Sequence, residues 1–315
     1  MAHMVVLCRR GRFSRDRFDS LLEMSDHGVF REAPAGAQDA NGRSPEMPAG
    51  AGGEHMRVCL VQMQVVRGDR EANRAAVRRL TEKAVQTDLP PDVLVLPELW
   101  STGYALERAG ELASSCGEDD AAFLGELAVR HNVSFVGGSV LAEVDGRIRN
   151  RAQVIDRSGR LTAFYDKIHL FRLMEEDRYL SRGNEICLFE LEGMRCALVI
   201  CYDIRFCELV RRLAVEGAEA LFVSAEWPMP RREHWETLLR ARAVENQMYV
   251  AACNVCGVTG QERFAGSSMI VAPDGTVPAR AGEEECLVYA DMNMDAVRSM
   301  RKAIPVFEDR VPSLY

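Results

Sequence analysis

The amino-acid sequence predicts one α/β domain with mixed sheets over residues 56–315. Three observations support this fold class. Segments with the composition of strands alternate with segments that have the pattern of helices from Arg57 onward. Several strand segments are continuous runs of Val, Ile and Leu, which is typical of strands covered on both faces. The pairs Asp145-Gly146, Ser158-Gly159 and Asp274-Gly275 are typical of hairpin turns, so part of the sheet structure is antiparallel.

The predicted strands are short and apolar. The first begins soon after Met56, and the second is closed by Pro97, which cannot donate a hydrogen bond to a sheet. In chain order the segments are Val58–Val65, Val93–Pro97, Ser134–Leu141, Ala152–Asp156, Cys196–Ile200, Ala220–Ala225, Tyr249–Val255, Ser268–Ala272 and Leu287–Asp291.

The predicted helices carry apolar residues on one stripe and charged residues on the other. In chain order they are Arg70–Gln86, Asp120–Arg130, Arg205–Glu216, Arg232–Asn246 and Asp295–Lys302. Alternation of these helices with the strands gives an α/β arrangement, and the chain shows no internal repeat.

Composition excludes several classes of protein. The 315 residues are 47% hydrophobic and 27% charged, which is too apolar for a disordered protein. A net charge of −8 disfavours partners such as nucleic acid or an anionic membrane. No apolar run approaches the roughly 18 residues that cross a bilayer, and we expect a soluble, cytoplasmic protein. The ten cysteines fall mostly in apolar segments, and we expect reduced thiols.

Residues 1–55 are predicted to be a mostly disordered N-terminal extension. Ala, Gly and Pro make up most of the stretch from Ala33 to His55, which therefore cannot bury enough apolar surface to offset the entropy of ordering it. Residues 14–24 have the pattern of a short amphipathic helix. Because Met56 precedes a strong strand, we hypothesise that it is the natural start of the chain.

Cys201 is the strongest candidate nucleophile. It stands where the apolar strand Cys196–Ile200 gives way to a helical pattern, and α/β proteins place ligands at that edge of a sheet. We expect the following helix N-terminus to favour its thiolate. For any single cysteine, however, a packed core position is the more common role.

Two more residues are candidates on the same reasoning. Glu98 is the first charged residue after the strand that Pro97 closes, where partial burial favours a general base. A capping or ion-paired role is equally compatible with that position. Lys167 lies among aromatic and aliphatic residues and could stabilise an oxyanion, although spacing alone favours a surface pair with Asp166.

The sequence gives little support for a metal site or a nucleotide site. The residues of Cys253-Asn-Val-Cys256 lie in a strand-like run, where positions three apart face opposite sides. The six histidines show no metal-ligand spacing, and no glycine-rich phosphate loop is present. We therefore expect no metal and no cofactor.

Three blocks together resemble the carbon–nitrogen hydrolase (nitrilase) superfamily. They are Leu96–Tyr104 (LPELWSTGY), Tyr165–Phe171 (YDKIHLF) and Leu198–Phe206 (LVICYDIRF). Their order is that of the family's glutamate, lysine and cysteine blocks, and the resemblance covers about residues 57–315. It implies a four-layer α-β-β-α sandwich and a homodimer or larger homo-oligomer.

The resemblance also implies a mechanism. Cys201 would be the nucleophile, Glu98 the general base, and Lys167 the oxyanion stabiliser together with the backbone N–H of Tyr202. Ammonia would leave a thioester that water then hydrolyses. Family amidases carry a second glutamate about eight residues past the lysine, and we assign it to Glu175, with Glu176 as the neighbouring alternative.

Within the superfamily, Tyr202-Asp203 after the cysteine indicates an amidase. The segments His169–Tyr179, His234–Asn246 and Ile304–Tyr315 look most like those of omega-amidases, which act on 2-oxoglutaramate. Such a small-molecule amide carries a carboxylate that needs a cation. The candidate cations are Arg172, Arg178 and Arg205, with a structural role as the alternative for Arg205. The candidate residues for the pocket wall are Trp227, Phe171 and Tyr104.

Three alternatives stay open. The first is an N-carbamoyl amino-acid or aliphatic amide hydrolase of the same superfamily. The second is a non-catalytic protein on this fold, which the presence of all three catalytic residue types disfavours. The third is a thiol-redox or metal-storage protein, suggested by the cysteines.

Overall fold

A computed structural model describes residues 55–314 of the chain. The hypothesis that Met56 is the start concerns the residues before it, and these, which form the expected extension with its short helix, lie outside this range except for His55. That residue already belongs to the first strand, β1 (His55–Gln62), which begins three residues earlier than predicted.

Two sheets form the centre of the described part. The first is mixed and has β15 and β6 at its edges, with the short β3 pairing in parallel with β4. Its order is β15 (Cys286–Asn293), β1, β2 (Val93–Val95), β4 (Ser134–Val144), β5 (Arg147–Ile155) and β6 (Leu161–Asp166), and β3 spans Ser114–Ser115.

The second sheet is also mixed, with β8, β9 and β10 parallel to one another. Its order is β14 (Ala279–Arg280), β13 (Met269–Val271), β10 (Tyr249–Asn254), β9 (Ala220–Ala225), β8 (Met194–Ile200) and β7 (Cys187–Leu191). A separate hairpin joins β11 (Cys256–Thr259) to β12 (Glu262–Ala265).

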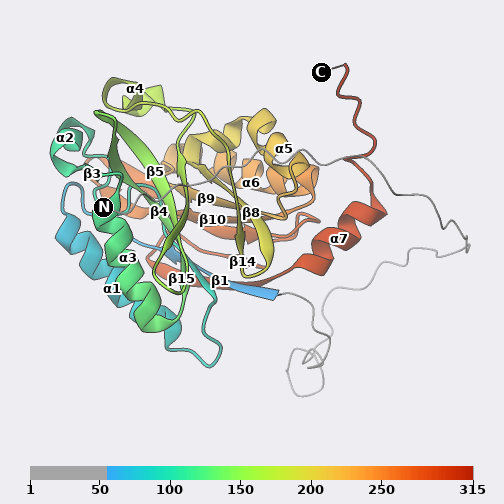
Figure 1. Cartoon of the computed structure of the whole chain (residues 1–315), viewed down its shortest axis with the longest axis horizontal. Coiled ribbons are helices and arrows are strands. Elements are labelled where there is room, and N and C mark those ends of the chain that lie inside the picture. The colour runs from blue at the N-terminus through green and yellow to red at the C-terminus, as the bar shows by residue number, and fades with distance from the viewer. Residues whose placement is uncertain (1–54, 315) are drawn as a thin grey trace, which may run out of the picture. The chain divides into compact units, whose positions relative to one another are not determined.

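The helices within residues 55–314 are α1 (Arg70–Val85), α2 (Ala109–Leu112), α3 (Glu118–His131), α4 (Glu176–Tyr179), α5 (Cys207–Val215), α6 (Arg232–Asn246) and α7 (Met294–Ala303). Of these, α1, α3, α5 and α6 cover the outer faces of the sheets. Figure 1 shows α1 and α3 together on one side of the strands and α5 and α6 on the opposite side. The expected four-layer sandwich is therefore confirmed.

Two apolar cores separate these layers. One contains Leu60 and Val95 of the first sheet with Leu198 and Phe222 of the second, so the sheets pack face to face. The same core continues to residues of α5 and α6. The other joins the outer face of the first sheet to α1 and α3. Burial on both faces explains why these strands are continuous apolar runs in the sequence.

All nine strands and five helices predicted after residue 56 are present, with ends that differ by a few residues. The three hairpin turns join β4 to β5, β5 to β6, and β13 to β14, each pair antiparallel. Elements that the sequence analysis missed are short or partly polar, namely β3, β6, β7, β11, β12, β14, α2 and α4.

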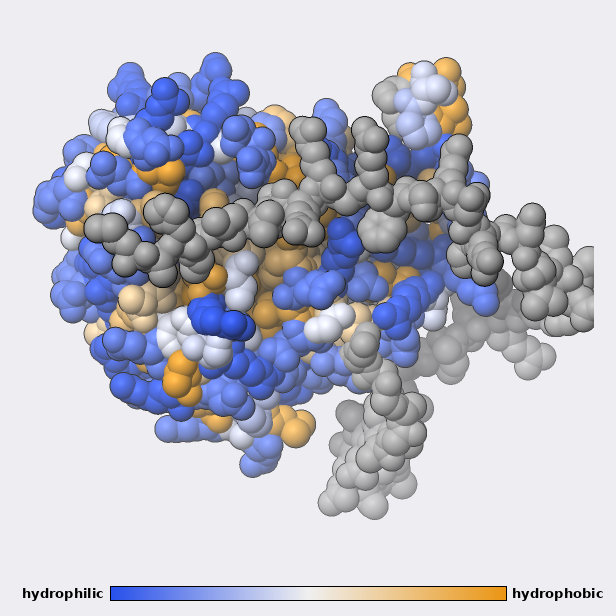
Figure 2. Space-filling view, viewed as in Figure 1, coloured by the Kyte–Doolittle hydropathy of each residue, from blue (hydrophilic) through white to orange (hydrophobic). Residues whose placement is uncertain are grey.

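The visible surface is largely hydrophilic, with small scattered apolar areas (Figure 2). Among residues 55–314, none of the helices has the length and hydropathy required to traverse a bilayer. All nine cysteines that the structure describes are free thiols.

Candidate active site

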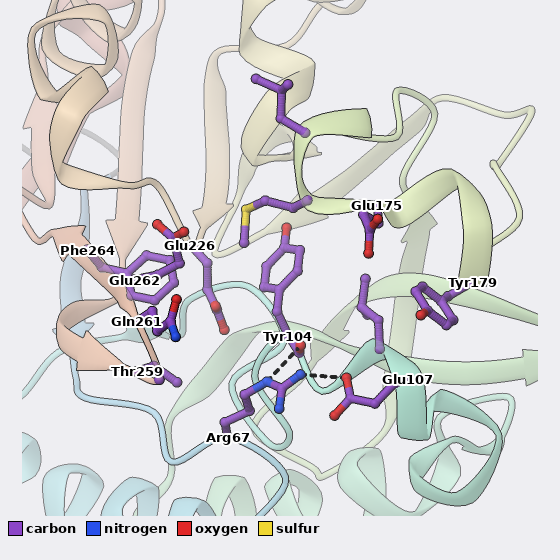
Figure 3. Close-up of a pocket in the computed structure, with 14 residues that line it drawn as sticks. Arg67, Tyr104, Glu107, Glu175, Tyr179, Glu226, Thr259, Gln261, Glu262 and Phe264 are labelled. Atoms are coloured by element: carbon purple, nitrogen blue, oxygen red, sulfur yellow. Dashed lines mark hydrogen bonds and ion pairs between the residues drawn. The ribbon is translucent and has the colours of Figure 1, made fainter.

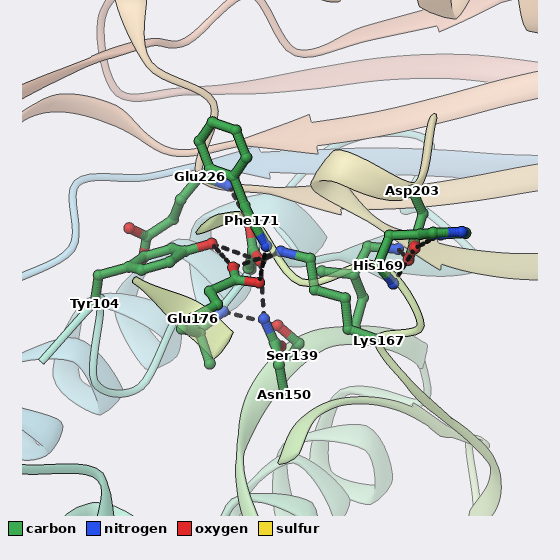
Figure 4. Close-up of polar contacts among 12 residues, drawn as sticks. Tyr104, Ser139, Asn150, Lys167, His169, Phe171, Glu176, Asp203 and Glu226 are labelled. Atoms are coloured by element: carbon green, nitrogen blue, oxygen red, sulfur yellow. Dashed lines mark hydrogen bonds and ion pairs between the residues drawn. The ribbon is translucent and has the colours of Figure 1, made fainter. Parts of the chain in front are cut away.

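Four side chains follow the ends of four strands and meet between the two sheets. Glu98 follows β2, Lys167 follows β6, Cys201 follows β8 and Glu226 follows β9. The Glu98 backbone N–H donates to the Ala225 carbonyl at 3.4 Å, which joins the ends of the two sheets directly. The strand ends thus bring residues far apart in the sequence into one buried cluster (Figure 4).

The Glu98 carboxylate is completely buried and fully hydrogen-bonded. Its Oε1 lies 2.7 Å from Lys167 Nζ and 2.8 Å from both Asn150 Nδ2 and the Tyr104 hydroxyl. Its Oε2 accepts the backbone N–H of Glu226 at 2.9 Å. A buried carboxylate with this many donors is held in one orientation.

Lys167 is a buried cation between two carboxylates. Its Nζ donates to Glu98 Oε1 at 2.7 Å and to Glu176 Oε1 at 2.6 Å. Burial alone would lower its pKa, but the two carboxylates outweigh burial and raise the pKa well above the ordinary value. Lys167 is therefore charged at neutral pH.

The surface pair of Lys167 with Asp166, which spacing alone favours, is not formed. Asp166 accepts hydrogen bonds from Arg151 at 2.7 and 2.9 Å and from Arg149 at 3.0 Å. Successive residues at the end of β6 face opposite sides, so Asp166 and Lys167 join different networks.

The structure places Glu176, and not the expected Glu175, beside Lys167. Glu176 is buried, and its Oε2 accepts the Phe171 N–H at 2.8 Å. Its Oε1 lies 2.6 Å from the Tyr104 hydroxyl, which can donate its one proton to Glu176 or to Glu98. Glu175 has φ of 59°, which turns its half-exposed side chain outward to pair with Arg178.

This correction gives a matched pair of variants. We expect Glu176→Gln to lower kcat/KM by about 10²-fold or more, because Lys167 loses one of its two anionic partners in a buried site. Glu175→Gln alters a surface pair and should leave kcat/KM within about twofold. Steady-state kinetics on both variants checks this. Equal effects from the two would contradict the placement.

Cys201 begins a 3₁₀ turn, Cys201–Arg205, directly after β8. Its φ is 46°, and only 5% of the residue is exposed. Burial, with the Glu98 carboxylate second, raises the pKa of the thiol well above its ordinary value. These surroundings favour the neutral thiol over the thiolate that the sequence suggested. The helix that was to favour it, α5, begins only at Cys207.

Asp203 links the lysine block to the cysteine block. Its Oδ2 accepts the Ile200 N–H at 3.0 Å and the Tyr165 hydroxyl at 2.9 Å, and its Oδ1 accepts the His169 N–H at 3.0 Å. The His169 ring stacks on Phe206 at 3.5 Å between centroids. Sequence reasoning used Asp203 only as an indicator of an amidase and missed this clamp, because its partners Tyr165 and His169 lie in a separate block and meet it only through the fold.

The loop that carries Glu98 depends on a glycine in β4. Gly138 has φ of 63°, and a Cβ there would lie 2.1 Å from the Pro97 carbonyl oxygen. The next residue, Ser139, accepts the Leu99 N–H at 2.9 Å through its hydroxyl. The close approach of the two backbones therefore fixes where the Glu98 loop leaves the sheet.

We expect Gly138→Ala to reduce the free energy of unfolding by roughly 2 kcal/mol or more and to lower kcat as well. Gly146→Ala is the control, because it has a similar φ of 69° with no atom within 4 Å of the added Cβ. Urea denaturation measures both. A loss no larger than that of Gly146→Ala would show that the backbone contact is not the cause.

Two cavities adjoin the cluster. The inner one is small and contains Cys201 with Phe171, Tyr202, Arg205, Trp227 and Arg231. The outer one has a volume of about 490 Å³ and is open to solvent (Figure 3). Its lining includes Arg67, Tyr104, Met174, Glu175 and Phe264. Glu226 lines both cavities.

The expected pocket residues divide into two groups. Phe171, Tyr202, Arg205 and Trp227 line the inner cavity, and Tyr104 contacts Glu98 and Glu176. Arg178 is a correction: its side chain is 68% exposed and pairs with Glu175. Arg172 is exposed and lines neither cavity.

Sequence reasoning missed Asn150, Glu226 and Arg231. Glu226 follows a buried strand as Glu98 does, so the rule that found Glu98 would also find it. In the range 55–314 the structure contains no group of three or more His, Cys, Asp or Glu side chains placed to hold a metal ion.

Comparison with known proteins identifies the family. The model of the carbon-nitrogen hydrolase family matches residues 57–302. The chain belongs to the carbon-nitrogen hydrolase family. Its relatives include the 2-oxoglutaramate amidase of Bacillus subtilis (strain 168), which is 46% identical over 224 residues, covering 71% of this chain and 86% of that protein. The chain is thus a carbon-nitrogen hydrolase acting on amides, as its three sequence blocks indicate.

Two further comparisons agree. Omega-amidase YafV of Escherichia coli (strain K12) is 34% identical over 256 residues, covering 81% of this chain and 96% of that protein. A mutant of the amidase from Nesterenkonia sp. AN1 has a similar structure, with a TM-score of 0.74 and 26% identity, covering 86% of this chain and 98% of that chain. That structure shows the acetamide moiety of fluoroacetamide added covalently at the active site cysteine.

Proposed function

We propose that this carbon-nitrogen hydrolase is an omega-amidase that releases ammonia from 2-oxoglutaramate or a similar omega-amide of a dicarboxylic acid. The names of its Bacillus and Escherichia relatives support this substrate class. The observation that carries the proposal is a pair of arginines beside Cys201 that no carboxylate of the described residues neutralises.

The two arginines are Arg205 and Arg231. Arg205 Cζ lies 4.8 Å from the centroid of the Trp227 ring, and Arg231 Cζ lies 5.4 Å from that of Phe171. Neither guanidinium forms an ion pair within residues 55–314. Burial is the main cause that lowers the pKa of Arg205; Tyr202 opposes this shift, and the charge of Arg231 adds to it. A substrate carboxylate would relieve this repulsion.

The mechanism starts from a neutral thiol. As Cys201 Sγ attacks the amide carbon, Glu98 takes the thiol proton. The carbonyl oxygen becomes an oxyanion, which Lys167 Nζ and the Tyr202 backbone N–H stabilise. Collapse of the tetrahedral intermediate breaks the C–N bond, and Glu98 returns the proton to the departing ammonia. A thioester on Cys201 remains.

Hydrolysis of the thioester completes the cycle. Glu98 takes a proton from water, whose oxygen attacks the thioester carbon. Cleavage of the C–S bond gives the free acid, and the proton on Glu98 regenerates the thiol. Glu176, Tyr104 and Asn150 keep Glu98 and Lys167 in place throughout.

The test is ammonia release by purified protein from a panel of amides. The panel contains 2-oxoglutaramate, an N-carbamoyl amino acid and acetamide. We expect kcat/KM of about 10⁴ M⁻¹s⁻¹ or more on 2-oxoglutaramate. Turnover of only the carbamoyl compound or only acetamide would overturn the substrate class and leave the mechanism in place.

Arginine variants test the site. Arg205→Gln and Arg231→Gln should raise KM for 2-oxoglutaramate and leave acetamide turnover, which needs no cation, nearly unchanged. Arg178→Gln is the control, because its side chain is exposed and lines neither cavity. Equal losses on acetamide would show that the arginines are structural.

We further propose a homodimer or larger homo-oligomer in the cytoplasm. The family resemblance supports assembly, and Ile304 and Leu314 near the C-terminal end are exposed apolar side chains that a second copy could cover. Free thiols support a reducing compartment. Light scattering would give the mass, and a monomer would contradict the assembly.

A further inference from the structure

Glu226 is a buried carboxyl group that the mechanism does not use. It follows β9 directly, and its backbone N–H donates to Glu98 Oε2 at 2.9 Å. The residue is 1% exposed, and neither side-chain oxygen has a hydrogen-bond partner within residues 55–314. A buried polar group without a partner is costly, and a substrate is the natural source of that partner.

The side chain stands between the inner and the outer cavity. Glu226 lines the inner cavity with Cys201 and the arginine pair, and it lines the outer cavity with Tyr104 (Figure 3). Gly103 is a neighbour of the carboxyl group, since a Cβ there would lie 3.8 Å from Glu226 Oε1.

The cation of the outer cavity does not neutralise Glu226. Arg67 pairs with Glu107 at 2.5 Å and donates to the Tyr104 carbonyl oxygen at 3.2 Å. Lys167 is held by Glu98 and Glu176. Glu226 therefore has no committed cation on either side.

Its surroundings favour the neutral form. Burial, followed by the charge of Glu98, raises the pKa of Glu226 well above the ordinary value; Glu176 adds to this, and Lys167 opposes it. The ionisable groups that share its two cavities or this cluster are Tyr104, Cys201, Tyr202, Arg205, Arg231, Arg67, Glu107, Glu175, Tyr179 and Glu262, with Glu98, Lys167 and Glu176. A neutral carboxyl group offers one O–H donor and one carbonyl acceptor.

We propose that Glu226 is a specificity-determining residue that donates a hydrogen bond to the 2-oxo group of the substrate. The inference rests on the proposed function. With the amide at Cys201 and the carboxylate at the arginine pair, the carbons between them lie in the cavity that Glu226 lines. A keto oxygen only accepts hydrogen bonds and suits the O–H donor.

A 2-amino group would be treated differently. Its ammonium only donates and would pair best with an ionised Glu226, which the neighbouring Glu98 and Glu176 carboxylates oppose. Glu226 would therefore favour a 2-oxo acid amide over the corresponding 2-amino acid amide, which is glutamine for the five-carbon substrate.

The experiment compares substrates that differ only at this carbon. They are 2-oxoglutaramate, glutaramate, in which CH₂ replaces the keto group, and glutamine. We expect the wild type to prefer 2-oxoglutaramate over glutaramate by about tenfold or more in kcat/KM. Glu226→Leu should abolish that preference by lowering kcat/KM for 2-oxoglutaramate, and it should leave kcat/KM for glutaramate within a few-fold. Glu226→Gln keeps a neutral donor and should retain the preference.

Control variants make the result decisive. Glu262→Gln changes an exposed carboxyl group of the outer cavity and should have no effect on any of the three substrates. Thermal unfolding reports whether each variant is folded. If Glu226→Leu does not fold, Glu226→Ala is compared on the same three substrates in its place.

Two outcomes would overturn the inference separately from the proposed function. Equal loss of 2-oxoglutaramate and glutaramate turnover in Glu226→Leu would mean that the residue acts on the cluster and does not contact the keto group. An unchanged preference for 2-oxoglutaramate in Glu226→Leu would mean that Glu226 contacts neither the catalytic cluster nor the keto group in a way that affects turnover. A wild type that hydrolyses other amides but not 2-oxoglutaramate would overturn the proposed function and this inference together.

Discussion

Replacement of Cys201 by Ala should reduce kcat/KM for amide hydrolysis by at least about 10⁴-fold. The reason is that no other described group can form the thioester: Cys201 is the only cysteine in the inner cavity. Stability should change little, since the thiol is neutral and small. Ammonia release measured with a coupled assay gives the rate, and circular dichroism gives the fold.

The matched control for this variant is Cys207→Ala. Cys207 lies six residues further on, at the start of α5, and is exposed. Its replacement should leave the rate within about twofold. If Cys201→Ala kept substantial activity, or if Cys207→Ala lost it, the proposed nucleophile would be wrong.

A thioester intermediate also predicts a specific mass. When the wild type is quenched during turnover, intact-protein mass spectrometry should show an added acyl group, and Cys201→Ala should show none. An adduct that maps to a peptide without residue 201 would contradict the mechanism.

The sequence was sufficient for residues whose position follows from a strand end. Glu98, Lys167 and Cys201 each come directly after, or within three residues of, a strand, so the order of strands in the sheets brings them together. The fold itself was predictable because buried strands and amphipathic helices leave clear patterns. The prediction of the three site residues and the prediction of the fold both depended on residue types and on their order along the chain.

Details set by backbone geometry were not predictable. The choice between Glu175 and Glu176 depends on the positive φ at Glu175, which no pattern announces. The charge state of Cys201 depends on burial beside Glu98, whereas the sequence suggested a helix N-terminus. Arg231 joins Arg205 only through the fold, because the two lie 26 positions apart on different elements.

Glu98→Gln should lower kcat/KM by about 10²–10⁴-fold, because an amide cannot accept the thiol proton. It should also leave Lys167 with Glu176 as its one carboxylate partner, and it places an N–H₂ group or a weaker acceptor against the Glu226 N–H. We therefore expect a modest loss of stability along with the loss of rate.

The same substitution has an opposite effect on the thiol. The Glu98 charge raises the pKa of Cys201, so its removal should lower that pKa. More thiolate then exists at a given pH, and labelling of Cys201 by methyl methanethiosulfonate should reach its half-maximal rate at a lower pH than in the wild type. Hydrolysis and labelling would thus change in opposite directions.

Opposite changes in the hydrolysis rate and in the labelling of Cys201 would distinguish a general base from a group that only maintains the fold. Damage to the fold would slow hydrolysis and expose every buried thiol to the reagent, which mass spectrometry would detect at Cys196 and Cys253 as well. Loss of a base leaves those thiols protected and alters Cys201 alone. If the labelling profile of Cys201 moved to higher pH, Glu98 would not be the anion that keeps the thiol protonated, and its role as base would have to be abandoned.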